Sequence, residues 1–216
     1  MNELNGHIES ILVETFKVLD AVYSNQREDI LFHPCEESRL IFPRYSLRHK
    51  DDTVRDPETR VSEQELRFAF VEQFNRICKS KNWPYYYSVE TPTDKRYVVS
   101  KGIEPRVAEK DEGVSAQFDL VIHDDEGRRK CRIEFKAGMS SPEKEFAKDF
   151  LILNEESGES ASYFVHLLDE NANQNTFTRI KNNRLQKKDE VIYICHVIKG
   201  KTYSEGSKSW EPLPSK

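Results

Sequence analysis

Long apolar runs and paired cysteines are absent from this chain. No stretch approaches the roughly 20 consecutive apolar residues that a membrane-spanning helix needs. The N-terminal MNELNGHIES has no basic start followed by an apolar core, so we expect no secretory signal. The four cysteines, at positions 35, 78, 131 and 195, form no CxxC pair, which favours free thiols over a disulfide scaffold. We therefore expect a cytoplasmic protein with no membrane partner.

The composition fits a protein with a polar surface and limits the number of cores. A chain of 216 residues can bury one sizeable core, or one core plus an accessory element. The formal net charge of −5 argues against a nucleic-acid binder when it is taken alone. However, local patches matter more than the total, and the carboxylates of a metal site add negative charge that a cation offsets. The net charge therefore leaves nucleic-acid binding open.

The first 60 residues predict a helix followed by an irregular extension. Apolar side chains recur at helical spacing from about residue 4 to 23, at Leu4, Ile8, Ile11, Leu12, Phe16, Leu19 and Val22. We expect this helix to pack on the main domain or on a partner protein. Residues 24–60 carry three prolines and many charges, which indicates little regular structure apart from a short strand near 39–42.

Residues 61–200 predict the core of the protein. A helix begins at Ser62, where Glu65 completes a capping box, and Pro142 occupies the favoured first position of a second helix. Strand patterns lie at 85–89, 96–100, 118–122, the run up to 136, 162–168 and 191–198, with a polar loop or helix at 171–188. This order predicts an α/β sandwich in which helices flank a central mixed sheet. Residues 201–216 predict a polar, frayed tail.

One hairpin, FDLVIHDDEGRRKCRIEFK, concentrates charged residues in apolar strands. Asp119 interrupts the apolar run of the first strand, and the turn at 124–127 folds the second strand onto the first. Glu134 and Lys136 are two residues apart, so their side chains leave the same face of the second strand. One interpretation is a surface charge ladder, which contributes little. The strand around Asp119 is apolar on both faces, however, which indicates burial and favours a functional site.

These residue types suit a divalent cation and phosphate chemistry. The carboxylates of Asp119 and Glu134 are the hard oxygen ligands that Mg²⁺ or Mn²⁺ prefers. The backbone carbonyl of Phe135, between Glu134 and Lys136, is a further candidate ligand. A bound cation polarises a phosphoryl group and lowers the pKa of a bound water, while Lys136 can orient that water or stabilise developing charge.

Asp119 followed by Glu134-Phe135-Lys136 resembles the D…(D/E)xK signature of the PD-(D/E)xK nuclease superfamily. The resemblance covers roughly residues 62–198 and implies a restriction-endonuclease-like fold. It also implies a metal-dependent nuclease that acts most readily on DNA, in restriction, repair or defence against mobile elements. The proline that often precedes the aspartate is missing, because Gln117 and Phe118 stand there. Dimerisation is a further implication, since a single site cuts one strand and two sites suit a duplex.

Many members of that superfamily place a glutamate on the first core helix, directed at the metal. Two residues of the predicted helix at 62–79 are candidates, Glu63 and Glu65. Glu63 shares a helical face with the apolar residues Leu66 and Phe70, whereas Glu65 lies off that stripe and has the capping box as its explanation. We therefore predict Glu63 as the additional metal and catalytic residue.

Basic residues follow the turn of the hairpin, at Arg128, Arg129, Lys130 and Arg132. Such a cluster is suited to phosphate contact, and it is equally typical of a solvated turn. A non-catalytic alternative uses the same fold as a binding or assembly module. The acidic net charge and the N-terminal helix favour a protein partner under this alternative.

Overall fold

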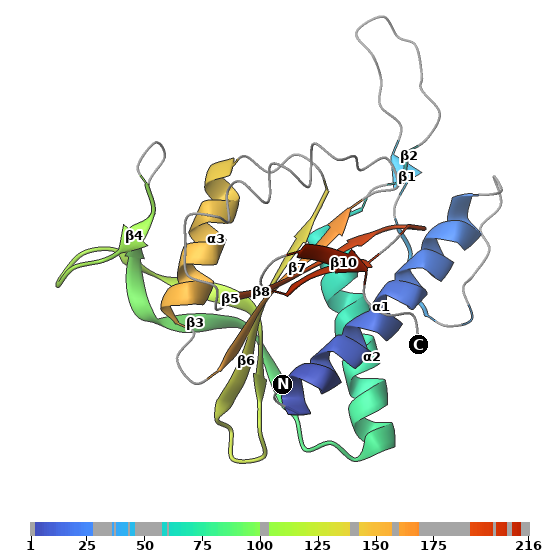
Figure 1. Cartoon of the computed structure of the whole chain (residues 1–216), viewed down its shortest axis with the longest axis horizontal. Coiled ribbons are helices and arrows are strands. Elements are labelled where there is room, and N and C mark those ends of the chain that lie inside the picture. Colours follow the sequence, from blue (N-terminus) through green and yellow to red (C-terminus); the bar gives the residue numbers. More distant parts are fainter. Residues whose placement is uncertain are drawn as a thin grey trace, which may run out of the picture.

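The computed structural model describes residues 3–27, 36, 38–42, 44–45, 58–59, 61–99, 104–138, 143–156, 160–168, 191–200, 202–206 and 209–212. Over these ranges the chain forms a mixed sheet with helices on its two faces, which confirms the expected α/β class (Figure 1). No helix in these ranges is long and apolar enough to cross a membrane. The prediction for 171–188 and most of the prediction for 24–60 lie outside the described residues.

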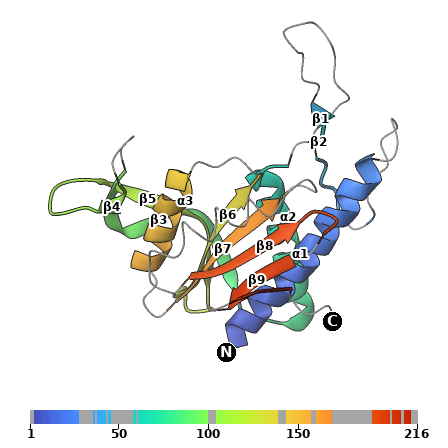
Figure 2. The ribbon, with the colours of Figure 1, turned by 45° about the horizontal axis from the view of Figure 1, so that its top comes forward.

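Three helices carry the apolar patterns seen in the sequence. They are α1 (Glu3–Arg27), α2 (Glu63–Lys81) and α3 (Glu143–Glu155). Helices α1 and α2 lie side by side, and α3 lies apart from them (Figures 1 and 2). The predicted helices at 4–23, 62–79 and after Pro142 are thereby confirmed, with their ends shifted by a few residues.

The main sheet has eight strands within the described ranges, in the order β10-β9-β8-β7-β6-β5-β3-β4. Their bounds are β3 (Tyr86–Val98), β4 (Arg106–Val107), β5 (Val114–His123), β6 (Arg129–Ala137), β7 (Ala161–Leu168), β8 (Val191–Val197), β9 (Thr202–Gly206) and β10 (Ser209–Pro212). Strands β6, β7 and β8 run parallel, and the other neighbours pair antiparallel. A separate two-stranded ribbon joins β1 (Arg44–Tyr45) to β2 (Glu58–Thr59).

The two faces of the sheet bury two separate hydrophobic clusters. Side chains of α1 and α2 pack on one face, and side chains of α3 pack on the other. Strand β6 shows the alternation directly, because Ile133 and Phe135 belong to the α1/α2 cluster. Glu134 and Lys136, between and after them, therefore leave on the α3 face.

The N-terminal helix is part of the main core. The seven apolar side chains that predicted it are buried in one cluster with residues of α2 and the sheet. Of the two expectations for this helix, packing on the main domain is therefore the one that the structure shows. Its apolar stripe is covered by this chain, so a protein partner of α1 would have to contact the other side of the helix.

The start of α2 differs from the predicted capping box. The hydroxyl of Ser62 donates to the carboxylate of Glu65, and it makes no side-chain capping bond to a backbone N–H. Glu65 is buried, with 7% of its surface exposed. The periodicity places Glu65 off the apolar stripe, and the structure nevertheless buries it at the start of α2, where its carboxylate accepts from Ser62.

Three further predictions of secondary structure differ from the structure. The segments 85–89 and 96–100 belong largely to one long strand, β3, which absorbs an irregularity between Pro92 and Arg96. The expected short strand at 39–42 is not a strand, although Phe42 is buried against Tyr23. The expected frayed tail after 200 instead adds β9 and β10 to the edge of the sheet beside β8. Backbone hydrogen bonding to an existing edge orders this polar segment without a strong apolar pattern.

Candidate functional site

The site lies where strands β5 and β6 separate. They pair as far as Leu120 and Ile133, after which β5 continues along β3 and β6 continues along β7. Extending the register by one residue sets Asp119 opposite Glu134. The hairpin thus brings together the two carboxylates that the sequence singled out, at a fork in the sheet.

Asp119 occupies the fork and closes it with a side-chain hydrogen bond. The backbone N–H of Phe135 donates to Asp119 Oδ2 at 2.7 Å. Arg67 of α2 places its Nη1 3.9 Å from Asp119 Oδ1. In a strand, the N–H and C=O of one residue leave on the same edge. The carbonyl of Phe135 therefore faces the fork as well, which is the orientation that its expected role as a ligand requires.

The ring of Phe135 anchors this backbone from the other face of the sheet. It is fully buried, and its centroid lies 5.5 Å from that of Phe70 on α2. Packing of the Phe135 ring in the core thus fixes the position of the backbone N–H that donates to Asp119.

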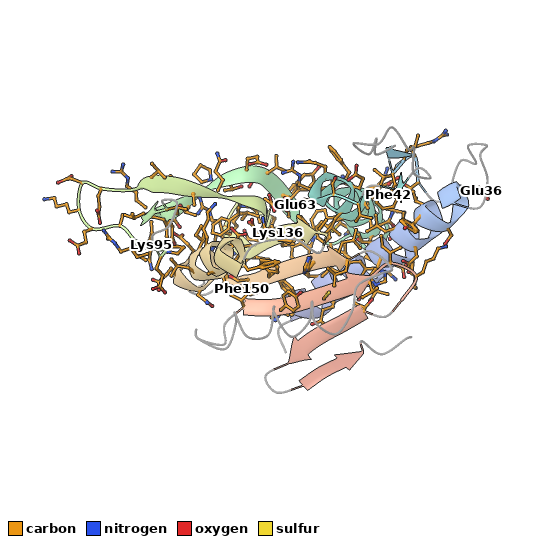
Figure 3. All side chains as sticks on the ribbon, turned by 90° about the horizontal axis from the view of Figure 1, so that it is seen from above. Glu36, Phe42, Glu63, Lys95, Lys136 and Phe150 are labelled. Atoms are coloured by element: carbon orange, nitrogen blue, oxygen red, sulfur yellow. The ribbon has the colours of Figure 1, made fainter. Side chains whose placement is uncertain are left out.

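Lys136 is surrounded by carboxylates from three elements. Its Nζ lies 3.2 Å from Glu134 Oε1, 3.2 Å from Asp149 Oδ2 on α3, and 3.6 Å from Glu63 Oε1 at the start of α2. Figure 3 shows Glu63 and Lys136 close together in the region between α2 and α3. The expected set of Asp119, Glu134, Lys136 and Glu63 is therefore gathered in one place.

Glu63 stands at the rim of the site. Its side chain is 45% exposed, whereas that of Glu134 is 12% exposed. The expectation that Glu63 faces inward is thus only partly met, because it is the first residue of α2 and projects from the end of the helix. Its carboxylate still reaches Lys136, and burial raises its pKa despite the opposing effect of that ammonium.

Asp149 is the site residue that the sequence reasoning missed. It lies on α3 between Phe146 and Phe150, both of which are buried in the α3 cluster. Its side chain is 7% exposed. A charged residue inside an apolar helical stripe is a signal that could have identified it, since Lys, Glu, Arg and Asp are rarely buried unless they are paired.

Negative charge exceeds positive charge at this site. Burial raises the pKa of Glu134 well above its usual value, and the neighbouring Asp149 and Asp119 raise it further. Burial also raises the pKa of Asp149 and of Asp119. For Lys136, burial alone would lower the pKa, but Asp149, Glu134 and Glu63 hold it above its ordinary value.

The oxygen donors at this site are of the chemical type that binds a hard divalent cation. Four carboxylates face one lysine and one arginine, so a cation would offset the surplus charge. Carboxylate and carbonyl oxygens are also the ligand types of Mg²⁺ and Mn²⁺. Among the described residues, however, no three His, Cys, Asp or Glu side chains stand in an arrangement that could hold a metal ion. The ammonium of Lys136 pairs with Glu63, Glu134 and Asp149 and offsets part of their negative charge.

His166 lies beside Lys136 in the register of β6 and β7 but is not available as a base. Burial lowers its pKa to about 4, so the ring is neutral near pH 7. Nε2 lies 2.9 Å from the carbonyl of Gly138, which can only accept, and Nδ1 lies 3.0 Å from the hydroxyl of Tyr193. Both ring nitrogens are therefore committed to neighbouring groups, which is typical of a structural histidine.

The basic residues of the hairpin lie away from the site. Arg129 begins β6, five residues before Glu134, which corresponds to about 17 Å along a strand. Arg128 pairs with Asp124 at 2.7 Å and Glu126 at 2.9 Å.

The other basic side chains of this group are also engaged within the chain. Arg129 pairs with Asp94 at 3.0 Å, and Lys130 lies 3.5 Å from Asp124. Arg132 is buried, with its guanidinium 5.8 Å from the centre of the Phe118 ring. Arg128, Arg129 and Lys130 are thus paired at the turn end of the hairpin, and Arg132, two residues before Glu134, is buried beside Phe118, which favours the structural interpretation of this group.

No protein-family model, no curated protein and no solved structure matches this chain.

Proposed function

We propose that this protein is a metal-dependent nuclease of the restriction-endonuclease-like fold that hydrolyses phosphodiester bonds, with DNA as the expected substrate. The observation that carries the proposal is the fork between β5 and β6, where Asp119 stands opposite Glu134 and Lys136 follows on the same face as Glu134. The order of a helix, a hairpin, a second helix and a parallel strand around that fork supports the same assignment.

Oxygen donors of this chain would bind Mg²⁺ or Mn²⁺ in the proposed enzyme. Asp119, Glu134 and the carbonyl of Phe135 would hold the cation, and Glu63 would assist from the rim. When bound, the cation supplies charge stabilisation for the phosphate and lowers the pKa of a water. Glu134 can pair with Lys136 and still offer an oxygen elsewhere, because a carboxylate has about four lone-pair sites.

Lys136 acts as a hydrogen-bond donor in this proposal. The carboxylates around it raise its pKa, so its ammonium keeps its proton near neutral pH. A protonated lysine cannot take a proton from water, but it can orient a water molecule or donate to a phosphate oxygen as negative charge develops. The N–H of Phe135 donates to the carboxylate of Asp119 and holds it in one orientation at the fork, where the cation would bind.

The proposed reaction suits several biological processes. Restriction, repair and defence against mobile elements all use phosphodiester cleavage, so each is a setting in which such an enzyme would act. One site cuts one strand, so cleavage of both strands of a duplex would require a homodimer or two binding events.

A second candidate is a catalytically inactive binding or assembly module of the same fold. The specific observation in its favour is the internal pairing of Lys136 with Glu63, Glu134 and Asp149. The ion pairs of Arg128 and Arg129 also favour this candidate. These two side chains already have acidic partners within the chain, so they are less available to bind phosphate.

A cleavage assay separates the two candidates. Purified protein would be incubated with plasmid, linear and single-stranded DNA and with RNA, in Mg²⁺, Mn²⁺ or EDTA. The nuclease proposal predicts cation-dependent cleavage that falls about 100- to 1,000-fold in Lys136→Ala. The matched control is Lys95→Ala, which removes a lysine paired with Glu155 on the outside of α3 and should cut normally. A protein that cuts none of these substrates with either cation would support the module instead.

A further inference from the structure

Asp149 is a buried carboxylate for which the proposed reaction has no assigned role. It lies in the middle of the face by which α3 docks on the sheet, between Phe146 and Phe150. The ring of Phe150 stacks on Phe164 of β7 at 4.5 Å, so the helix is already held by aromatic packing. Burying a carboxylate there disfavours the fold unless the charge is paired. The ammonium of Lys136 lies 3.2 Å away and pairs with it, and Lys148 of the same helix adds a further positive charge nearby.

Lys136 needs an anchor that does not depend on Glu134. A lysine side chain carries about 2 kcal/mol of rotamer entropy, so one contact fixes its ammonium poorly. Glu134 lies on the same strand, and in the proposed reaction its carboxylate also binds the cation. Glu63 lies farther away, at 3.6 Å, and is half exposed. Asp149 reaches the ammonium from a different element and is itself immobilised by burial.

We propose that Asp149 is a positioning residue that holds the ammonium of Lys136 beside the Asp119–Glu134 pair while Glu134 binds a divalent cation. This inference rests on the proposed function. It assigns α3 a direct part in the site, since a shift of the helix would move the carboxylate that fixes the lysine. Asp149 touches neither the phosphate nor the cation in this arrangement and acts through Lys136.

The kinetic test compares substitutions that differ in charge and reach. Asp149→Asn keeps the size of the side chain and removes its charge, so we expect kcat at saturating Mg²⁺ to fall about 10- to 100-fold. The KM for DNA should stay close to that of the wild type. Asp149→Glu restores the charge and should recover part of the loss. The control Glu155→Gln removes a carboxylate from the exposed side of the same helix and should leave kcat unchanged. Equal kcat values for Asp149→Asn and Glu155→Gln would overturn the proposal.

A second measurement follows Lys136 directly and needs no activity. The ¹⁵N-bound ammonium protons of a lysine give an NMR signal only when ion pairing slows their exchange with water, and Lys136→Arg identifies the signal by its loss. We expect the signal to persist in wild-type protein with saturating Mg²⁺ and to be lost in Asp149→Asn but not in Glu155→Gln. Persistence in Asp149→Asn would overturn the proposal.

The two measurements distinguish a failure of the proposed function from a failure of the proposed role of Asp149. Wild-type protein that cleaves no nucleic acid would refute the proposed function, and the ammonium signal would still decide whether Asp149 fixes Lys136. If Asp149→Asn does not fold, Asp149→Glu carries the test, because it should keep the signal while its displaced carboxylate lowers kcat. Wild-type kcat in a folded Asp149→Glu would then count against the proposal.

Discussion

Asp119 has two functions that substitution can separate, one in the fold and one in the proposed chemistry. It accepts the hydrogen bond of the Phe135 N–H at 2.7 Å, and this N–H belongs to a fully buried residue. Asp119→Ala leaves the donor without its acceptor, which costs about 1–3 kcal/mol for a buried group. Asp119→Asn keeps an acceptor of the same reach. Both variants lose the carboxylate that the proposed reaction needs.

The charge of Asp119 also affects the stability of the folded protein. Burial raises the pKa of Asp119, so its ionisation is disfavoured in the folded protein in the absence of a cation. Asp119→Asn removes that penalty and should be at least as stable as the wild type near pH 7. Asp119→Ala should melt below Asp119→Asn by about 2–12 °C, since 1 kcal/mol shifts the melting temperature of a chain of this size by about 2–4 °C.

Thermal unfolding followed by circular dichroism without divalent cations measures this difference, and a cleavage assay runs alongside it. We expect both variants to stay folded and neither to cut DNA. A melting temperature for Asp119→Asn as low as that of Asp119→Ala would refute the assigned hydrogen bond. Wild-type cleavage by either variant would refute the role of the carboxylate.

Three other expectations concern charge and burial. The pKa of Glu134 lies well above the usual 4.5 because of burial, so its ionisation weakens the fold as pH rises through the raised value. Glu134→Gln should therefore be more stable than the wild type at mildly alkaline pH without divalent cations, and the gap measured by urea unfolding should close as pH falls towards 4.5. Arg128→Gln and Arg129→Gln should leave cleavage within about twofold of the wild type and stability within about 0.5 kcal/mol, because these residues lie at the hairpin turn; a large loss of DNA cleavage would restore them as phosphate contacts. The thiols of Cys131 and Cys195 are fully buried, so Ellman's reagent should modify them only at the rate of unfolding, and rapid labelling of the native protein would contradict this packing.

Local patterns in the sequence predicted the elements that bury an apolar stripe. The periodicity of α1 and α2 and the short alternations of β5 and β6 are set by the core and can be read without knowledge of the neighbours. The tight turn predicted that Asp119 and Glu134 would lie close together, but it does not set their register, because a bulge between Ile122 and His123 shifts the pairing by one residue. The prediction of the two carboxylates and Lys136 as one cluster therefore needed only local information.

The parts that the sequence did not reveal depend on contacts between distant segments. Asp149 enters the site because α3 docks beside β6. The periodicity of α3 determines neither its distance from β6 nor its orientation on the sheet. Strands β9 and β10 form because β8 offers a free edge to a polar segment with a weak pattern of its own. The exposure of Glu63 and the burial of Glu65 were not predicted for the same reason, since both depend on what packs against the first turn of α2.

Binding of Mn²⁺ at the fork tests the central claim most directly. Crystals of the wild-type protein soaked in Mn²⁺ would be examined by anomalous scattering, with Glu134→Gln crystals as the control. The account predicts a single peak between the carboxylates of Asp119 and Glu134 in the wild type and none in the variant. No peak at the fork in the wild type at saturating Mn²⁺, with Lys136 still paired to Glu134, would contradict the account and favour the non-catalytic module.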